Sequence, residues 1–471
     1  MNRAWDKMLR QRAKVESCAI PADFEERVDH MLKNLPEREI RKKVRQVNTL
    51  LVAAVVCILL TVTAAAYAMG GFEFMRGRSE HTYLGMNEIY ETYAQTVGVS
   101  VAAENGNVVT VDRVAMDGKF CTIFYSVQFR EPLMTAEQLK QLQKDNQDGW
   151  FTATEYLPGF YLYAGDEEIS FDGYQNSFEP QVYFADEYTV YGAWRFLLRR
   201  PAEEGETLSL RGGYYERDEN NEWQLGWDFA LDFAAHPISG EHFDSDVTFT
   251  AVLQGQDVRV EVLSLDRSPL GNLLTLRQEQ MGSASLGVDF ALRDADTGKY
   301  IPYAEVNVNH YWDPEGYTDN VYELFGDVSD LKNLELIPTT GIGGVSPQKA
   351  VPLTDLPCMD SGNQDGGYAP ASYSAKNGQL IVEMQPVGAV NGWYARLGNG
   401  VYFLDAQGNQ LFEDVWVEKY KDRSDGTITV VMTPSAESYA RDVDKVAQVQ
   451  FFVQQYEVLE GKTVSIPLIA S

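Results

Sequence analysis

The stretch NGNVVTVDRVAMDGKFCTIFYSV, residues 105–127, decides which fold the sequence predicts. A Gly turn leads into residues 109–114, where apolar and polar side chains alternate, and the alternation resumes over residues 121–127 after a second turn. Alternation with a period of two is typical of strands that bury one face and expose the other. We therefore expect an antiparallel hairpin at the start of a β-sandwich, with Cys121 as a buried free thiol.

The same pattern occurs again 149 residues later. Residues 254–266 read QGQDVRVEVLSLD and align without a gap, so that Val109 corresponds to Val258 and Asp117 to Asp266. Each copy is a Gly turn followed by an alternating strand, which is the start of one β domain. The match predicts a duplicated sandwich.

Shorter signals predict a third unit. Turn sequences at residues 294–299 and 405–409 each lie between strand signals, and Gly or Asn supplies the positive φ that such hairpin turns need. The units end in similar late strands at residues 208–210, 334–336 and 449–453. The predicted fold class is mainly β, with two or three immunoglobulin-like β-sandwich domains.

The expected domain organisation follows from these units. It comprises a cytoplasmic helical segment (1–48), a transmembrane helix (49–70), a first extracellular β domain with a leading helix (71–240), a second β-sandwich (241–345), a Gly/Pro/Ser-rich linker or long loop (346–375) and a third β-sandwich (376–471). The leading helix would carry Met86, Ile89, Tyr90, Tyr93 and Val97 on one face.

The predicted span is the uncharged run LLVAAVVCILLTVTAAAYAM, residues 50–69. A helix of this length spans about 30 Å, the thickness of the hydrocarbon core of a bilayer. Basic residues between Arg38 and Arg45 precede the run, so the positive-inside rule places the N-terminus in the cytoplasm and the C-terminal domains outside the cell. Ala66-Tyr67-Ala68 resembles a signal-peptide cleavage site, but the 49 residues before the run are too long for a leader. We expect a retained, single-pass anchor in the cell membrane.

The segments before and after this predicted span carry net charges of opposite sign. The 471 residues carry a net charge of −30, of which residues 1–48 contribute +4 and residues 71–471 contribute −34. Nucleic-acid binding depends on a basic face that neutralises phosphates. We therefore expect no nucleic acid as a partner.

The cytoplasmic segment contains an amphipathic helix. Asp23 and Glu26 have capping-box spacing, and Pro36 ends the helical pattern. Its apolar face is formed by Phe24, Val28, Met31, Leu32 and Leu35. Because 48 residues cannot bury a core of their own, this face needs another surface. The candidates are a groove on a partner protein, the inner leaflet of the membrane, or a second copy of the helix.

Three segments together resemble a known family. They are IPADFEERVDHMLKNLPE with the basic run after it, the span ending in AAAYA, and NGNVVTVDRVAMDGKFCTIFYSV. This combination resembles the membrane-anchored, anti-sigma-factor-like family of Firmicutes known as domain of unknown function 4179. The resemblance is clearest over residues 20 to about 130 and looser through the β-rich remainder.

The resemblance implies that residues 1–45 sequester an extracytoplasmic-function sigma factor while the ectodomain senses the envelope. Zinc-type anti-sigma domains carry a His and a CxxC motif, whereas the cytoplasmic part here has only Cys18 and His30 without that spacing. A zinc-dependent mechanism is therefore excluded. The remaining mechanism inserts the apolar face that contains Phe24 and Val28 into a groove of the sigma factor.

The sequence indicates no enzyme. It contains no GxSxG, HExxH, P-loop or GxGxxG motif, and its five histidines show no spacing typical of a metal site or a catalytic triad. Acidic turns such as residues 294–296 do not complete an EF-hand loop. We therefore expect no catalytic residues, no cofactor and no bound metal.

A cell-surface binding module or adhesin is the alternative function, with the N-terminal part serving only as an anchor. The aromatic pairs Tyr311-Trp312 and Trp393-Tyr394, with Tyr317 and Tyr322, could stack on a cell-wall glycan, although core or edge packing is the favoured explanation of such residues. The ectodomain ligand in either case would be a glycan or a protein.

Overall fold

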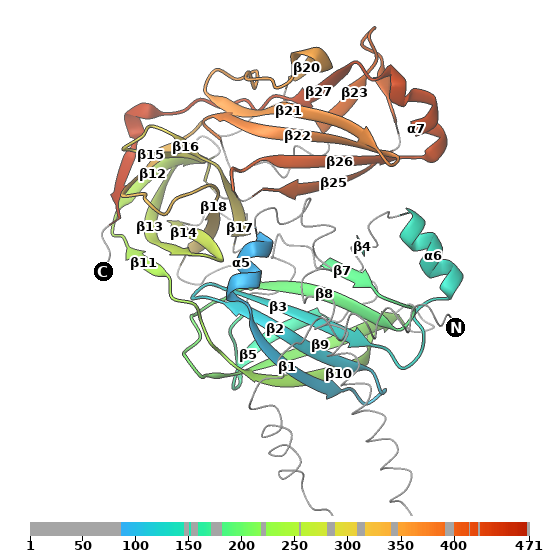
Figure 1. Ribbon diagram of the computed structural model, residues 1–471. Helices are drawn as coiled ribbons and strands as arrows, with labels where there is room; N and C mark the ends of the chain where they lie inside the picture. The colour runs from blue at the N-terminus through green and yellow to red at the C-terminus, as the bar shows by residue number, and fades with distance from the viewer. Residues whose placement is uncertain are drawn as a thin grey trace, which may run out of the picture. The chain divides into compact units, whose positions relative to one another are not determined.

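The computed structural model describes twelve ranges of the chain: 86–145, 150–151, 159–170, 181–217, 223–253, 256–279, 288–308, 316–340, 347–390, 400–413, 415–422 and 424–468. All of them lie in one compact unit, Thr63–Ser471. They form antiparallel sheets with few helices, which confirms the prediction of a mainly β protein (Figure 1). The predicted cytoplasmic segment and span lie outside these ranges, and within them no helix has the length and apolar character to cross a bilayer.

The first sandwich follows a short helix, α5 (Met86–Tyr93), and contains α6 (Ala136–Asp145). One sheet has the order β1 (Gln95–Ala102), β2 (Val108–Met116), β3 (Phe120–Gln128), β8 (Thr189–Leu197), β7 (Gln181–Phe184), β4 (Trp150–Phe151). The other has the order β10 (Trp223–Ala234), β9 (Thr207–Arg217), β5 (Gly159–Ala164), β6 (Glu167–Glu168).

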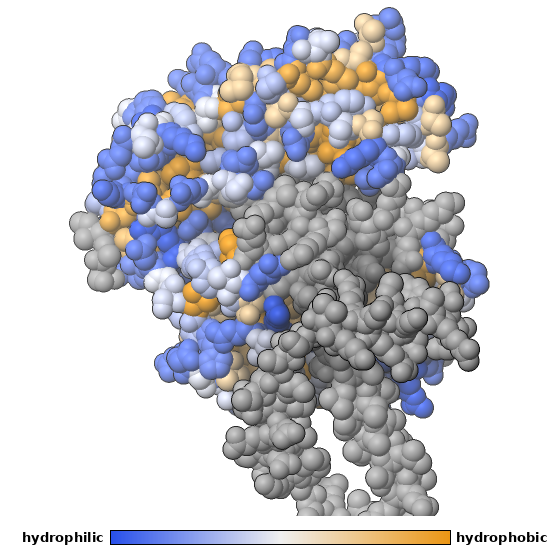
Figure 2. All heavy atoms as spheres, in the orientation of Figure 1, coloured by the Kyte–Doolittle hydropathy of each residue, from blue (hydrophilic) through white to orange (hydrophobic). Residues whose placement is uncertain are grey.

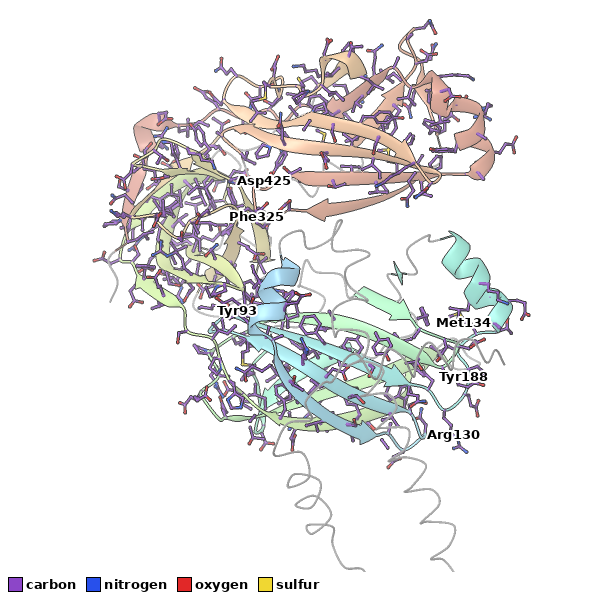
Figure 3. All side chains as sticks on the ribbon, viewed as in Figure 1. Tyr93, Arg130, Met134, Tyr188, Phe325 and Asp425 are labelled. Carbon is purple, nitrogen blue, oxygen red and sulfur yellow. The ribbon has the colours of Figure 1, made fainter. Side chains whose placement is uncertain are left out.

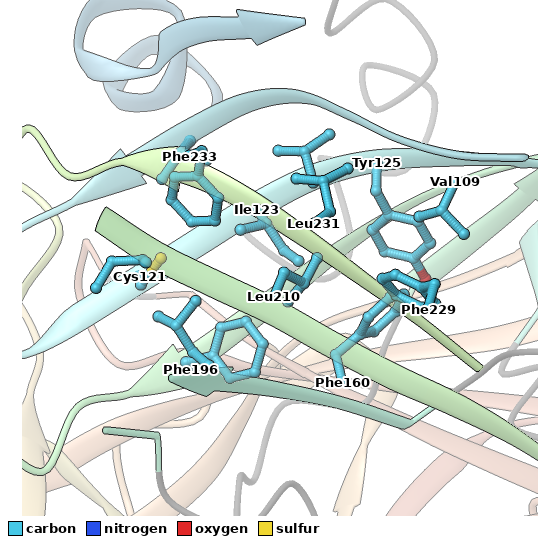
Figure 4. Close-up of a cluster of buried hydrophobic side chains, with 14 of the residues drawn as sticks. Val109, Cys121, Ile123, Tyr125, Phe160, Phe196, Leu210, Phe229, Leu231 and Phe233 are labelled. Carbon is cyan, nitrogen blue, oxygen red and sulfur yellow. The ribbon is translucent and has the colours of Figure 1, made fainter. Parts of the chain in front are cut away.

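The core of this sandwich is built by the predicted alternation. Cys121, Ile123 and Tyr125 on β3 point into the cluster that Phe160 and Leu210 enter from the opposite sheet (Figure 4). Each of these side chains is at most 1% exposed. Full burial of one large apolar side chain contributes about 1.5–3 kcal/mol, so the shared core holds the two sheets together.

The second sandwich repeats this arrangement. Its first sheet has the order β11 (Glu241–Asp244), β13 (Gln256–Ser268), β14 (Gly271–Glu279), β18 (Tyr317–Leu324), β17 (Tyr303–Val308), with β12 (Thr248–Leu253) also paired to β13. Its second sheet has the order β16 (Tyr300–Ile301), β15 (Phe290–Asp294), β19 (Asn333–Pro338), β28 (Val464–Pro467).

The third sandwich has two four-stranded sheets. Their orders are β20 (Gln348–Pro352), β27 (Gln448–Phe452), β23 (Val401–Leu404), β24 (Gln410–Leu411) and β21 (Gly366–Lys376), β22 (Gln379–Gly388), β26 (Ile428–Pro434), β25 (Val415–Lys421). Helix α7 (Ala436–Asp442) is capped by the Ser435 side chain. Three 3₁₀ turns are Leu353–Asp355, Val443–Lys445 and Glu460–Lys462.

The internal repeat is visible in the topology. β2-β3-β8-β7, β13-β14-β18-β17 and β21-β22-β26-β25 are the same strand order, and each faces a second sheet built on a short hairpin. The hairpin turns predicted from sequence are confirmed, with Gly298 and Gly408 at φ +73° and +84°. The repeated strands β2 and β13 also share an irregularity in their pairing with the following strand, at residues 111–113 and 262–264.

Three expectations are wrong. Residues 346–375 are not a linker, because β20, a 3₁₀ turn and most of β21 lie there. The glycines that suggested a loop serve close packing, since a Cβ on Gly366 would lie 2.2 Å from the carbonyl oxygen of Ala389. The last strand, β28, completes the second sandwich rather than the third, with Ile466 buried in the second core. Val97 lies in β1, because the helix ends at Tyr93 and a stretch of β-branched residues follows.

Candidate functional site

The predicted partner-binding residues Phe24, Val28, Met31, Leu32 and Leu35 lie outside the described residues, so the structure does not place them. Within the described part, the most specific arrangement of side chains is the contact between the first two sandwiches. We call it the junction.

An apolar cluster forms the centre of the junction. Tyr90 of α5 joins Ala115, Phe120, Phe124 and Leu197 of the first sandwich with Leu270, Leu273, Val306 and Val321 of the second. Apart from Tyr90 in α5 and Leu270 in the turn after β13, these residues belong to the outer faces of sheets whose inner faces already form the sandwich cores. The strand β3 is therefore buried on both faces over Phe120–Val127, which explains why its sequence is almost continuously apolar.

A buried ion pair crosses this cluster. The Arg195 Nη2 atom lies 3.4 Å from Glu323 Oε1, and each of the two side chains is 2% exposed. The same nitrogen donates to the Leu270 carbonyl at 2.6 Å, and the guanidinium carbon lies 3.4 Å from the centre of the Phe120 ring. Gly271 makes the approach possible, because a Cβ there would lie 2.6 Å from the Phe120 ring and 2.8 Å from Glu323. Burial of both charges makes the partners strongly dependent on each other.

Polar residues line the edge of the junction. The Ser268 hydroxyl donates to the Asp117 carboxylate, and Lys119 Nζ lies 3.5 Å from Asp266. Burial raises the pKa of Asp117. His242 contacts Asp266 at 2.6 Å and Asp244 at 2.9 Å, and the hydrogen bond with Asp266 is the main cause that raises the pKa of His242.

These edge contacts are reciprocal with respect to the repeat. Asp117 and Asp266 are equivalent positions, and so are Lys119 and Ser268, each pair 149 residues apart. The aspartate of each copy contacts the turn residue of the other. Such reciprocity is the property of a two-fold, self-complementary interface, here formed within one chain.

Helix α5 is anchored in the junction by Tyr90. Its hydroxyl hydrogen-bonds the Thr122 hydroxyl at 3.1 Å, its ring packs edge-on against Phe124 at 5.1 Å, and its side chain is 2% exposed. Burial raises the pKa of Tyr90. Tyr93 at the end of the helix is exposed (Figure 3). Helix α5 is also the first described element after the predicted span.

A groove of about 740 Å³ lies between residues of the second and third sandwiches. The β15–β16 turn, residues 325–333 and Asp425 contribute to its lining, and Phe325 and Asp425 are labelled in Figure 3. Several of its carboxylates already have partners: the Thr297 hydroxyl bonds Asp294 and lowers the pKa of Asp294. Within the described ranges, no group of three or more His, Cys, Asp or Glu residues is arranged to hold a metal ion.

Of the aromatic residues considered for glycan stacking, the structure describes only Tyr317 and Tyr322. Tyr322 packs against Phe290 with ring centres 4.9 Å apart and is 3% exposed, so it is a core residue, which is the explanation favoured from the sequence. Tyr317 is exposed, and the two aromatic pairs lie outside the described ranges. Cys121 is a buried free thiol, as predicted, and Cys358 is also free.

Sequence reasoning missed the residues of the junction. The available signals were Arg195 within the apolar stretch YGAWRFLL and Glu323 within NVYELF. A charge in a strand that is otherwise buried requires a partner of opposite sign. One sequence contains many such charges, however, and does not show which two meet.

Three comparisons with known proteins bear on the family of this chain to different extents. No functionally curated protein matches the chain. A solved structure described as a conserved domain protein from Bacillus anthracis is similar over 57% of this chain and 84% of that chain, at 13% identity and a TM-score of 0.37. Residues 40–129 match a family model, and the matched range contains the predicted span, α5 and strands β1–β3. The matched model is that of the family described as domain of unknown function DUF4179, and the match supports membership of this family.

Proposed function

We propose that this chain is a membrane-anchored regulator whose cytoplasmic helix sequesters a sigma factor and whose ectodomain responds to the state of the envelope. The proposal involves no catalysis, cofactor or metal. The part of the proposal that concerns the N-terminal segment rests on the predicted amphipathic face around Phe24 and Val28. This face has no domain of its own to pack on.

The burial of Tyr90 in the junction is the observation that carries the proposal. Only residues 71–85 separate α5 from the predicted span, and the helix is the first described element after that span. A ligand or force that changes the junction changes the support of α5, because Tyr90 shares one cluster with side chains from both sandwiches. Coupling between distant sites requires an element whose equilibrium both sites bias, and the proposal assigns this part to α5 and the junction.

The strand order supports an immunoglobulin-like assignment of the sandwiches. In chain order, β2, β3, β5, β7, β8, β9 and β10 occupy the places of strands A to G, with A-B-E-D in one sheet and C-F-G in the other. The second and third units repeat this order, with β28 and β20 in the place of strand G. Immunoglobulin-like sandwiches are common in the recognition domains of cell-surface proteins.

The test is capture of the full-length chain from detergent-solubilised membranes of its source, followed by mass spectrometry. We expect a sigma factor with the wild-type chain and its loss with Phe24→Asp plus Val28→Asp, since charges would be buried in the groove. Lys33→Glu is the control, because it changes the charge by the same amount on the opposite helix face. Equal recovery from all three chains, or no sigma factor from any, would contradict the proposal.

A surface-binding module remains the second candidate, and the groove between the second and third sandwiches favours it. In that case residues 1–45 have no binding partner of their own and, with the predicted span, serve only as an anchor. Replacing them with an unrelated basic segment would then leave the cellular phenotype unchanged, whereas a regulator would lose its function.

A further inference from the structure

The two faces that meet at the junction are built from equivalent strands. β2, β3 and β8 of the first sandwich occupy the places of β13, β14 and β18 of the second. Met116 lies opposite Cys121, and its repeat equivalent Leu265 lies opposite Leu274. Cys121 and Leu274 are therefore equivalent, which fixes the register between the two sheets.

This register shows which junction residues correspond. Cys121 pairs with Phe196, and Leu274 pairs with Tyr322. Arg195 and Val321 each lie one position before these partners, so they are equivalent. One position after those partners, Leu197 corresponds to Glu323. The ion pair thus joins Arg195 of the first copy to Glu323, which occupies the Leu197 place of the second copy. The apolar equivalents of these two residues, Val321 for Arg195 and Leu197 for Glu323, belong to the same cluster.

The ion pair consequently decides which faces can pair. Two first sandwiches joined by this face would each place Arg195 against an apolar Leu197. Two second sandwiches would each place Glu323 against Val321. Both arrangements bury unpaired charges, and only the pairing of a first with a second sandwich satisfies both groups.

We propose that the junction is an exchangeable interface and that its alternative partner is a second copy of this chain. In the exchanged form, the first sandwich of each chain pairs with the second sandwich of the other, and both ion pairs form. The connection between β10 and β11, residues 235–240, is neither helix nor strand, and extended it spans about 20 Å. The same contacts can therefore close within one chain or between two, which is the usual basis of domain exchange. This proposal does not depend on the identity of the cytoplasmic partner.

Charge reversal tests the exchange directly. Arg195→Glu places two carboxylates at the junction of one chain, and Glu323→Arg places two guanidinium groups there. When the two full-length variants are mixed after co-solubilisation, exchange forms two junctions with opposite charges. One pairs the carboxylate introduced at position 195 with the guanidinium introduced at position 323, and the other pairs the native Arg195 with the native Glu323. We expect a heterodimer by light scattering that forms from the mixture in at least tenfold excess over dimers of either variant alone.

The double variant Arg195→Glu plus Glu323→Arg is the matched control. It carries both changes but restores opposite charges at its own junction, so we expect the oligomeric distribution of the wild-type chain and no preferential pairing with either single variant. A mixture that stays monomeric while both single variants keep the wild-type circular dichroism spectrum would overturn the proposal.

A second experiment keeps the ion pair intact, so that folding is not at risk. Lys119→Cys is introduced into one copy and Asp266→Cys into a differently tagged copy, because these two side chains meet at the edge of the junction. Both are co-expressed as full-length chains and treated with a short thiol crosslinker. A crosslinked species carrying both tags supports exchange. A third chain that carries both Lys119→Cys and Asp266→Cys is the control for closure within one chain. Crosslinking in this control without any crosslink between the two tagged copies would refute exchange.

Discussion

The junction between the first two sandwiches and the region between the second and third differ in how they exclude water. The junction buries nine apolar residues and an ion pair whose two side chains are 2% exposed. The second region has a smaller cluster, Ala291, Ala389 and Tyr456, beside an open groove of about 740 Å³. Hydrophilic residues are frequent on the visible coloured surface in Figure 2. The comparison suggests that the first two sandwiches act as one closed element, while the groove remains accessible to ligands.

Breaking the ion pair on one side should have the largest effect. Glu323→Leu leaves the Arg195 guanidinium buried without its carboxylate, and such changes cost about 3–5 kcal/mol. Arg195→Leu plus Glu323→Leu removes both charges and should recover most of the loss. Denaturant unfolding of the full-length chain measures both. Equal destabilisation by the single and double variants would contradict the assignment of the pair.

Removing the anchor of α5 should be nearly as costly. Tyr90→Ala empties a buried site and should cost about 3–5 kcal/mol, as for other large aromatic residues. Tyr90→Phe removes only the hydrogen bond with Thr122 and should cost about 0.5–1.5 kcal/mol. Protease sensitivity near residues 86–93 should rise steeply for the first variant and little for the second. Resistance of the alanine variant would show that Tyr90 does not hold the helix.

Adding a methyl group in the junction tests how tightly its side chains are packed. Gly271→Ala places a methyl group 2.6 Å from the Phe120 ring and should cost about 1–3 kcal/mol. Gly298→Ala, at the hairpin turn beside the groove, meets no atom within 4 Å, and its cost would come only from its φ of +73°. Thermal melting of the two variants separates steric closeness from backbone strain. A heavier loss for the second would contradict the comparison.

Stability should fall as the pH rises toward 8. Burial, opposed by Arg113, raises the pKa of Asp112 to about 7, so the folded state favours its neutral form. His242 also has a raised pKa, through Asp266 first, so its charged form contributes to stability. Both contributions are complete below the unfolded-state pKa values and are lost as pH rises through the folded-state values. Asp112→Asn and His242→Gln should each flatten the dependence of Tm on pH. Because His242 is exposed, its contribution to the free energy of unfolding is at most about 1 kcal/mol.

The smallest effect is expected at the groove. Asp330 is among the residues that line it, and its side chain is exposed. Asp330→Asn should therefore change the free energy of unfolding by less than about 0.5 kcal/mol. Denaturant unfolding against the wild-type chain measures this, and a loss comparable to that of Glu323→Leu would remove the distinction between the two regions.

Sequence reasoning recovered the elements whose signals are local. The alternation around Ile123 predicted the hairpin, and the ungapped match of Asp117 with Asp266 predicted the repeat that the topology contains. It failed where the decisive contact is distant. Strand β28 pairs with β19, which lies far earlier in the chain, and nothing in the sequence VSIP shows which edge it joins. Arg195 and Glu323 meet only because the outer faces of two sandwiches pack together, and alternation describes one sheet at a time.

Hydrogen exchange of α5 tests the central claim most directly, namely that the helix that follows the predicted span is held by the closed junction. Backbone amides of residues 86–93 would be compared in the full-length wild-type chain, Glu323→Leu, the Arg195→Leu plus Glu323→Leu variant and Asp330→Asn. The account predicts faster exchange in α5 for Glu323→Leu alone, with protection close to wild type in the other two. Unchanged protection of α5 in a chain whose junction strands exchange faster would contradict the claim.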